Sequence, residues 1–161
     1  MFKQMRRKDR EVTNENEIIS IIDQCDVCKI AMIDKDKPYV VPMNFGYSVR
    51  NHIVTLYFHS ANEGRKIDVL KINPNVCIEM DCGHKLLIGD TDCAYSMEYE
   101  SLIGNGQVEF IESIAEKNFA LTLIMKKYTS KDNFSFDEKA ISRLTVFQIV
   151  LSDLVGKRLS K

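Results

Sequence analysis

The chain has 161 residues, of which 45% are hydrophobic and 28% are charged, and its formal net charge at pH 7 is −1. This length and composition suit a single domain over residues 1–161 that is large enough to bury a core. Because the net charge is close to zero, it offers no global attraction to nucleic acid or to an anionic membrane. Any cationic site must therefore be local.

Apolar residues do not cluster into a membrane-spanning or export segment. No apolar run approaches the roughly 20 residues needed to cross a bilayer. Residues 1–17 are rich in charge and lack the apolar stretch of a signal peptide. We therefore expect a cytoplasmic protein that has neither a nucleic-acid partner nor a membrane partner.

The five cysteines form an odd-numbered set, which indicates reduced thiols rather than a disulfide framework. Cys25 and Cys28 have the spacing of a redox or zinc motif, but no second pair has this spacing. His84 lies two residues from Cys82, again without a second pair of ligands. We therefore predict no metal site and interpret the cysteines as small core or surface residues.

The first half of the chain predicts a helix, three strands and a second helix. Residues 15–25 have the apolar spacing of a short amphipathic helix. Strands are predicted over 28–33, 39–47 and 52–59, with polar turns at 34–38 and 48–51. Pro42 interrupts the second strand, which indicates a sheet edge, a bulge or a place where a ligand approaches. A helix over 63–72 then ends at Asn73-Pro74.

In the second half of the chain, apolar and polar residues alternate less regularly. A strand is predicted over 76–80, a strand edge or loop over 85–92, and one long bent strand or hairpin over 95–112, where Gly104 and Gly106 permit the bend. The clearest helix is 113–129, with Ser113 and Glu116 at the spacing of a capping box. A short helix over 137–143 and an alternating strand over 144–159 follow. The predicted fold is mainly β: a small closed or split β-barrel of six antiparallel strands with peripheral α-helices.

Polar and cationic residues gather where the third strand should lead into the helix over 63–72. The N–H groups and the partial positive charge of a first helical turn attract anions. Ser60 can donate a hydrogen bond, Gly64 allows close backbone approach, and Arg65 and Lys66 add positive charge. The combination indicates a phosphate site.

A second interpretation of the same stretch needs no ligand. In it, Ser60 or Asn62 caps the helix, and the cations face solvent or pair with Glu63 or Asp68. Spacing alone leaves both interpretations open.

Two long motifs and three flanking ones resemble a known superfamily. These are "PYVVPMNFGY" (38–47), "LYFHSANEGRKIDVLKINPNVCIEMD" (56–81), "MRRKDREV" (5–12), "YESLIGNGQVEFIE" (99–112) and "VGKRLSK" (155–161). Together they resemble the FMN-binding split-barrel superfamily that includes pyridoxamine 5'-phosphate oxidase. Within it, the sequence is most similar to the nitroimidazole-resistance (nitroimidazole reductase-like) proteins.

The resemblance implies a homodimer of split barrels with FMN in a cleft at the subunit interface. It implies that the flavin ring is lined, largely through backbone groups, by Val41, Pro42, Met43 and Asn44. It also places His59 and Ser60 beside the flavin and has the phosphate held by Arg65 and Lys66. It implies that the partner subunit completes the cleft with the stretch around Ser101, Gly104 and Gly106. His59 is the candidate for a catalytic role in proton donation or substrate orientation, although it could equally be a hydrogen-bonded residue of the cleft wall.

The sequence also departs from pyridoxamine 5'-phosphate oxidase itself. It has no tryptophan, and "VGKRLSK" has no histidine, so oxidation of pyridoxamine phosphate is not expected. We expect an FMN-dependent oxidoreductase in which reduced flavin, charged by a small-molecule electron donor, passes electrons to a small organic acceptor such as a nitroaromatic or nitroimidazole. The alternatives are a flavin-binding protein without turnover, and a haem-binding split barrel with His59 or His84 as ligand.

Overall fold

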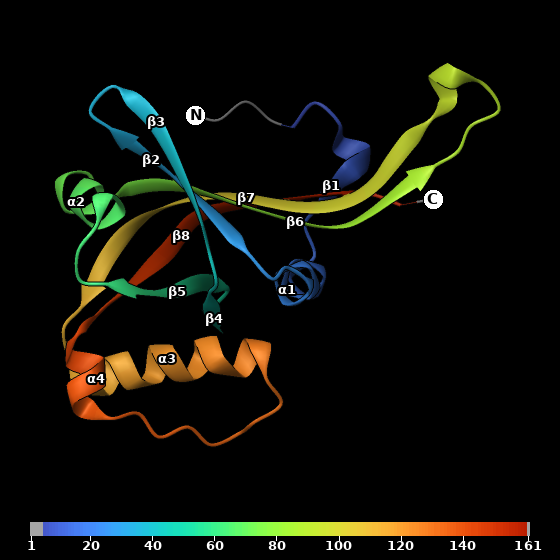
Figure 1. Cartoon of the computed structure of the whole chain (residues 1–161). Helices are drawn as coiled ribbons and strands as arrows, with labels where there is room; N and C mark the ends of the chain where they lie inside the picture. The colour runs from blue at the N-terminus through green and yellow to red at the C-terminus, as the bar shows by residue number, and fades with distance from the viewer. Residues whose placement is uncertain (1–4, 161) are drawn as a thin grey trace.

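The computed structural model describes residues 5–160 and consists of one curled antiparallel sheet with helices against its inner side and ends (Figure 1). The strand order is β3-β2-β6-β7-β8-β5-β4, and β1 pairs with β8 beside this path. The strands are β1 (Glu11–Val12), β2 (Cys28–Asp34), β3 (Lys37–Met43), β4 (Gly46–Arg50), β5 (Ile53–Ala61), β6 (Asn75–Leu87), β7 (Ser96–Ile111) and β8 (Leu144–Leu159). The helices are η1 (Lys8–Arg10), α1 (Glu15–Gln24), α2 (Arg65–Ile72), η2 (Asp92–Ala94), α3 (Ile114–Tyr128) and α4 (Glu138–Ser142). No described helix is long and apolar enough to cross a membrane.

Two apolar clusters hold the chain together. The larger cluster fills the barrel, where Phe58 of β5 stacks on Phe147 of β8 with ring centroids 5.3 Å apart. The smaller cluster joins the other face of β5 and β8 to α3 and α4, through residues such as Tyr57 and Ile124. Each fully buried side chain of this size stabilises the fold by about 1.5–3 kcal/mol. Strand β5 is therefore covered on both faces.

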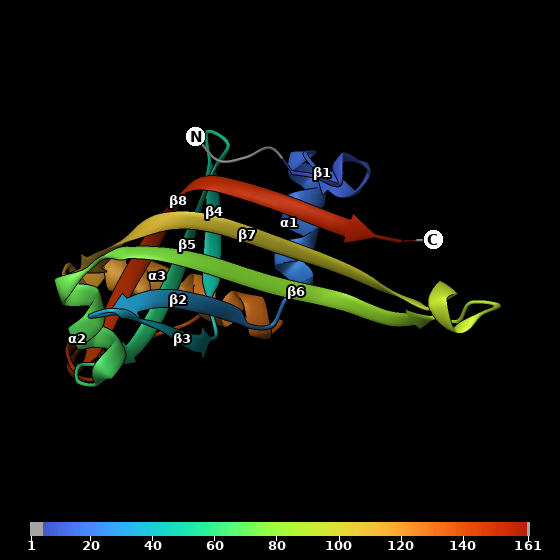
Figure 2. The ribbon, with the colours of Figure 1, turned by 90° about the horizontal axis from the view of Figure 1, so that it is seen from above.

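The hairpin of β6 and β7 extends beyond the barrel as an arm, which Figure 2 shows at the end of the sheet opposite α2. A register shift between Cys82 and Lys85 marks the start of this arm. Its exposed apolar side chains include Leu86 and Met97, which pair across the two strands. In the same view no described helix lies over the middle of β6, β7 and β8, so residues 5–160 leave this outer face of the sheet uncovered.

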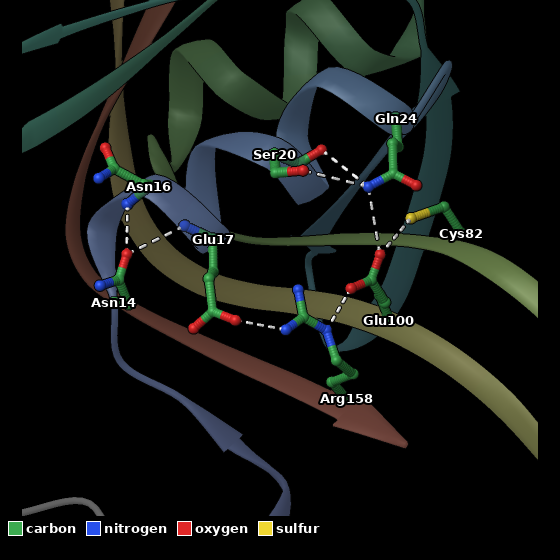
Figure 3. A network of polar contacts seen from close by, with 8 residues as sticks. All are labelled: Asn14, Asn16, Glu17, Ser20, Gln24, Cys82, Glu100 and Arg158. Carbon is green, nitrogen blue, oxygen red and sulfur yellow. Dashed lines mark hydrogen bonds and ion pairs between the residues drawn. The ribbon is translucent and has the colours of Figure 1, made fainter. Parts of the chain in front are cut away.

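A polar network fixes α1 to the sheet (Figure 3). The Arg158 guanidinium donates from Nη1 to Glu17 Oε1 at 2.5 Å and from Nε to Glu100. The other oxygen of Glu100 accepts a hydrogen bond from Gln24 at 3.3 Å. Hydrogen bonds to the two carboxylates raise the pKa of Arg158. The network therefore joins the two ends of α1 to neighbouring strands.

The predicted antiparallel, mainly β fold is confirmed, but the sheet has eight strands rather than six. The predicted strand 39–47 is divided at Asn44 and Phe45 into β3 and β4, and β1 was not predicted. The predicted turn at 48–51 is wrong: the chain reverses at Asn51 and His52, whose φ angles of 49° and 65° suit a tight hairpin. The segments 76–80 and 85–92 overlap one strand, β6, which ends at Leu87.

The long segment 95–112 is a single strand, β7, and the predicted bend is present. The pairing of β7 with β8 shifts register between Asn105 and Gly106. The helices predicted over 113–129 and 137–143 correspond to α3 and α4. Ser113 does occupy the N-cap position of α3, but its side chain makes no capping hydrogen bond, so the capping box is not formed.

Candidate functional site

The start of α2 has no side-chain cap. Its N-cap is Gly64, with φ 134° and ψ 157°, a conformation that L side chains rarely adopt. No side chain caps the helix, and among the described residues nothing accepts a hydrogen bond from the backbone N–H groups of Arg65 and Lys66. Neither Ser60 nor Asn62 caps α2, and Asn62 instead accepts a hydrogen bond from Thr145 at 3.0 Å. The capping alternative for these two residues is therefore wrong.

The two cations at this helix start differ in their surroundings. Arg65 Nε donates to Asp34 at 2.8 Å, and its guanidinium lies over the Tyr39 ring, 4.3 Å from the centroid. Arg65 therefore ties α2 to the β2–β3 hairpin, although other N–H groups of the guanidinium remain. Lys66 is half-buried, and within residues 5–160 no side chain or carbonyl forms a hydrogen bond or ion pair with its ammonium group. Neither cation pairs with Glu63 or Asp68.

His59 and Ser60 are neighbours in β5 and point to opposite faces of the strand. Ser60 is 7% exposed and lies on the side of Phe58, facing the barrel. His59 lies on the side of Tyr57 and faces α3 and α4. Partial burial and the positive charge of Lys66 lower the pKa of His59 from its usual 6.5. The lowered pKa favours the neutral form of the imidazole at pH 7.

Strand β3, which carries the predicted ring-lining residues, forms one edge of the sheet. Val41 and Met43 pack against the barrel core, whereas Pro42 is exposed. Asp34 and Lys37 flank a two-residue loop and therefore form a hydrogen-bonded pair, and such pairs alternate with non-hydrogen-bonded pairs along the two strands. Pro42 belongs to a non-hydrogen-bonded pair, so its backbone carbonyl points away from β2 toward the free edge. No described strand pairs with that edge. The predicted edge position of Pro42 is confirmed.

The corner between β3 and β4 is held by Asn44, which the sequence analysis named, and by two residues of α3 that it did not. The Tyr128 hydroxyl accepts a hydrogen bond from the Phe45 N–H at 3.0 Å and donates to the Asp26 carbonyl at 2.8 Å. The Asn44 amide donates to the same carbonyl at 3.2 Å. Lys127 reaches the Ile22 carbonyl at 2.7 Å. The sequence placed Lys127 and Tyr128 in the helix predicted over 113–129, but it did not indicate their contacts.

The predicted partner-subunit residues lie in β7, in the middle of the sheet. Strands β2 and β6 separate β7 from β3, and β8 separates it from β5. Ser101 therefore does not join the α2 site within one chain. A Cβ atom on Gly104 would lie 2.7 Å from the Asp153 carbonyl oxygen, and one on Gly106 would lie 2.5 Å from that of Val150. Both glycines are required for the close approach of β7 to β8.

The remaining histidines and the thiols lie elsewhere. His84 is exposed beside Asp81, at 3.3 Å, and His52 contacts Glu15 at 2.6 Å. Cys25 and Cys28 are buried in the barrel core, as predicted for small hydrophobic residues, and burial raises the pKa of Cys25 to about 12. All five cysteines are free thiols. Within residues 5–160, no three or more His, Cys, Asp or Glu side chains are grouped so that they could hold a metal ion.

The donors around the α2 N-terminus fit a phosphate group. They comprise an ammonium that has no partner in the part of the chain that the structure describes, two uncapped backbone N–H groups and a guanidinium with spare N–H groups. The neighbouring free edge of β3 offers backbone carbonyls and the N–H of Val40, which suit a planar ring that both donates and accepts hydrogen bonds. The site can therefore hold a molecule with an anionic tail and a heteroaromatic ring.

The chain is similar to proteins of known family and structure. Residues 14–158 match the protein family described as pyridoxamine 5'-phosphate oxidase. A proposed 5-nitroimidazole antibiotic resistance protein from Bacteroides thetaiotaomicron is 42% identical and superimposes with a TM-score of 0.81, covering 92% of this chain and 86% of that one. No curated protein matches the chain.

More distant structures share the fold. The flavocytochrome Anf3 from Azotobacter vinelandii is 17% identical with a TM-score of 0.81, over 98% of this chain and 72% of that one. An FAD-binding protein from Mesorhizobium loti is 21% identical with a TM-score of 0.65, over 94% of this chain and 98% of that one. These matches confirm the split-barrel fold.

Proposed function

The chain belongs to the pyridoxamine 5'-phosphate oxidase family of split-barrel proteins, and we propose that it binds FMN and serves as an FMN-dependent oxidoreductase. The observation that carries the proposal is the open N-terminus of α2 together with Lys66, whose ammonium group has no partner within residues 5–160. The resemblance of residues 56–81 to the split-barrel motif, which implies a flavin phosphate held by Arg65 and Lys66, supports the proposal. The FAD-binding relative from Mesorhizobium loti supports a flavin as the ligand class.

Each part of the site has a task in this proposal. Lys66 and the first turn of α2 bind the phosphate, with Arg65 contributing N–H groups beyond its contact with Asp34. The free edge of β3 binds the ring through backbone groups, and Tyr128 fixes the corner at which that strand ends. When bound, the flavin supplies the electron transfer itself, whereas the protein supplies binding, orientation and exclusion of water.

The electron acceptor in this proposal is a small organic molecule, and a nitroaromatic is the preferred class. The support for this class is the relative described as a 5-nitroimidazole resistance protein, at 42% identity. His59 is the candidate for orienting the acceptor, because its neutral form is favoured at pH 7 and can donate a hydrogen bond. A nicotinamide nucleotide is the proposed electron donor.

The proposal includes a homodimer that buries the outer face of the sheet. Exposed apolar side chains run across this face, including Ile103 of β7, 51% exposed, and its pairing partner Val155 of β8, 43% exposed. A hollow of ≈ 580 Å³ between Pro38, Cys77 and Val150 lies on the same face. Apolar surface of this kind is characteristic of subunit interfaces, and a second copy would bring its own β7 to the site by two-fold symmetry.

A flavin titration tests the proposed cofactor. Flavin-free protein mixed with FMN should develop a perturbed visible flavin spectrum that saturates at one FMN per chain. A protein that leaves the FMN spectrum unchanged, or that binds haem instead, would contradict the proposal. If the bound flavin is reduced anaerobically and nitrobenzene then fails to reoxidise it, the protein binds flavin without turning over this class of acceptor.

The oligomeric state tests the proposed interface separately. The substitution Ile103→Arg should convert the dimer to a monomer in light scattering, because it places a charge at the centre of the outer face. The matched control is Ile72→Arg, which changes an apolar residue that is 86% exposed on α2, away from that face. A wild-type monomer, or a dimer that survives Ile103→Arg, would contradict the interface.

A further inference from the structure

A cavity of ≈ 340 Å³ lies where β5 meets α3 and α4, on the side of the strand that His59 faces. Its walls are mainly apolar and are formed by Leu121, Ile124, Met125, Phe136, Ile141 and Leu144. This size lies at the lower end of the range for ligand pockets, about 300–1,000 Å³. The cavity is therefore suited to a small molecule with an apolar body.

The polar groups of this cavity select against a negatively charged ligand. No lysine or arginine lines it among the described residues, so an anion would lose its hydration without gaining a counter-charge. The carboxylate of Asp137 lies at the wall, and one of its oxygens accepts a hydrogen bond from the Ala140 N–H at 2.9 Å as the cap of α4. His59 and Ser135 remain as neutral hydrogen-bonding groups. These features disfavour an anionic ligand.

Two side chains that line the cavity, Met125 and Phe136, suit contact with an aromatic ring. Met125 is 41% exposed, and its flexible thioether can contact the face or edge of an aromatic ring. Phe136 comes from the irregular segment between α3 and α4 and stacks on Phe134, with ring centroids 6.2 Å apart. Because Met125 and Phe136 both line the cavity, an aromatic ring bound there can contact a thioether and a phenyl group, which are favourable neighbours for it.

The cavity shares one residue, His59, with the proposed flavin site. His59 lines the cavity and lies in β5, the strand that leads into α2, and burial together with the positive charge of Lys66 lowers its pKa. We propose that the cavity binds a small aromatic molecule without negative charge, which donates or accepts one hydrogen bond at His59 and packs its ring against Met125 and Phe136. The assignment of this molecule as the electron acceptor rests on the proposed function, whereas the binding itself does not require flavin.

Binding to the flavin-free protein tests the cavity directly. Nitrobenzene and benzoate have the same ring and differ in charge, so isothermal titration should show benzoate binding at least about tenfold more weakly. The substitution Ala140→Phe adds a ring at the cavity wall and should weaken nitrobenzene binding about tenfold or more. Lys139→Phe makes the same addition at the neighbouring residue, which does not line the cavity, and should leave binding unchanged.

Equal binding of the two probes, or equal binding of nitrobenzene to wild type and Ala140→Phe, would overturn the proposal. A second variant, Met125→Lys, changes a partly exposed wall residue and should also weaken binding, which covers the case in which Ala140→Phe fails to fold. FMN titrations of the same proteins separate the two proposals. If FMN does not bind while Ala140→Phe still blocks nitrobenzene, the cavity stands and the flavin proposal fails.

Discussion

Charged side chains are paired near α1, whereas a cation at the start of α2 lacks a partner among the described residues. Near α1, the Arg158 guanidinium lies between the carboxylates of Glu17 and Glu100, and each side chain of the network has a partner (Figure 3). At the end where α2 lies, Lys66 has no hydrogen-bonding partner within residues 5–160 and the helix has no side-chain cap. Paired charges hold elements in place, whereas an unpaired, half-buried cation beside open N–H groups is available to a ligand.

The same contrast applies to the two adjacent cations of α2. Arg65 contacts Asp34 and Tyr39 and contributes to the attachment of the helix. Lys66 makes no such contact, although it is the more buried of the two. Sequence adjacency therefore does not imply a shared role, and the following substitutions are chosen to separate binding from folding.

The largest expected effect is on flavin affinity. Lys66→Ala should weaken FMN binding about 10- to 100-fold, because a charge-assisted hydrogen bond contributes about 1.5–3 kcal/mol. The unfolding midpoint should stay unchanged, since the ammonium stabilises nothing within the described chain. Lys71→Ala, in the last turn of the same helix, is the control for loss of charge and should bind FMN normally. Equal losses in both variants would contradict a specific role for Lys66.

The opposite outcome is expected at the other end of the sheet. Arg158→Met leaves two carboxylates without their donor and should lower the free energy of unfolding by about 1–2 kcal/mol, measured by urea denaturation. FMN affinity should not change. Lys126→Met removes an exposed cation of α3 and should have almost no effect on stability. A variant Arg158→Met as stable as wild type would show that the network does not fix α1.

The smallest expected effect is on the titration of His59. Because Lys66 lowers the pKa of His59, Lys66→Ala should raise that pKa toward 6.5, whereas Lys71→Ala should not. The measurement is an NMR titration of the imidazole protons in flavin-free protein. An unshifted His59 pKa in Lys66→Ala would mean that the two side chains do not interact.

The lowered pKa of His59 also has a consequence for stability. Between the folded-state pKa and 6.5, the unfolded chain binds more protons at this residue than the folded chain does, so stability falls as the pH falls through that window. His59→Gln should make the unfolding free energy less dependent on pH there. A slope identical to that of wild type would contradict the lowered pKa.

Much of the sheet could be predicted from the sequence because its strands alternate apolar and polar residues. The same rule would have separated Ser60 from His59, since neighbours in a strand face opposite sides. The strand β4 was missed because Ser48 and Arg50 resemble a polar turn. The cation cluster at the strand-to-helix junction was likewise visible in the sequence. The pairing of Arg65 with Asp34 depends on folding, because 31 positions separate the two residues.

The residues that hold the corner between β3 and β4 could not be predicted from the sequence for the same reason. Tyr128 and Lys127 act on carbonyl groups of the α1–β2 region about a hundred residues earlier in the chain, and no local pattern encodes such contacts. The open N-terminus of α2 was also not evident, because Ser60 and Asn62 are both plausible caps by residue type. Only the three-dimensional structure shows that neither residue caps the helix.

A crystal structure of the protein grown with FMN tests the central claim most directly. We expect the phosphate to lie within hydrogen-bond distance of Lys66 Nζ and of the first backbone N–H groups of α2. A phosphate bound elsewhere, with the Lys66 ammonium directed into bulk solvent, would contradict the assignment of the α2 N-terminus as the anchor of the flavin.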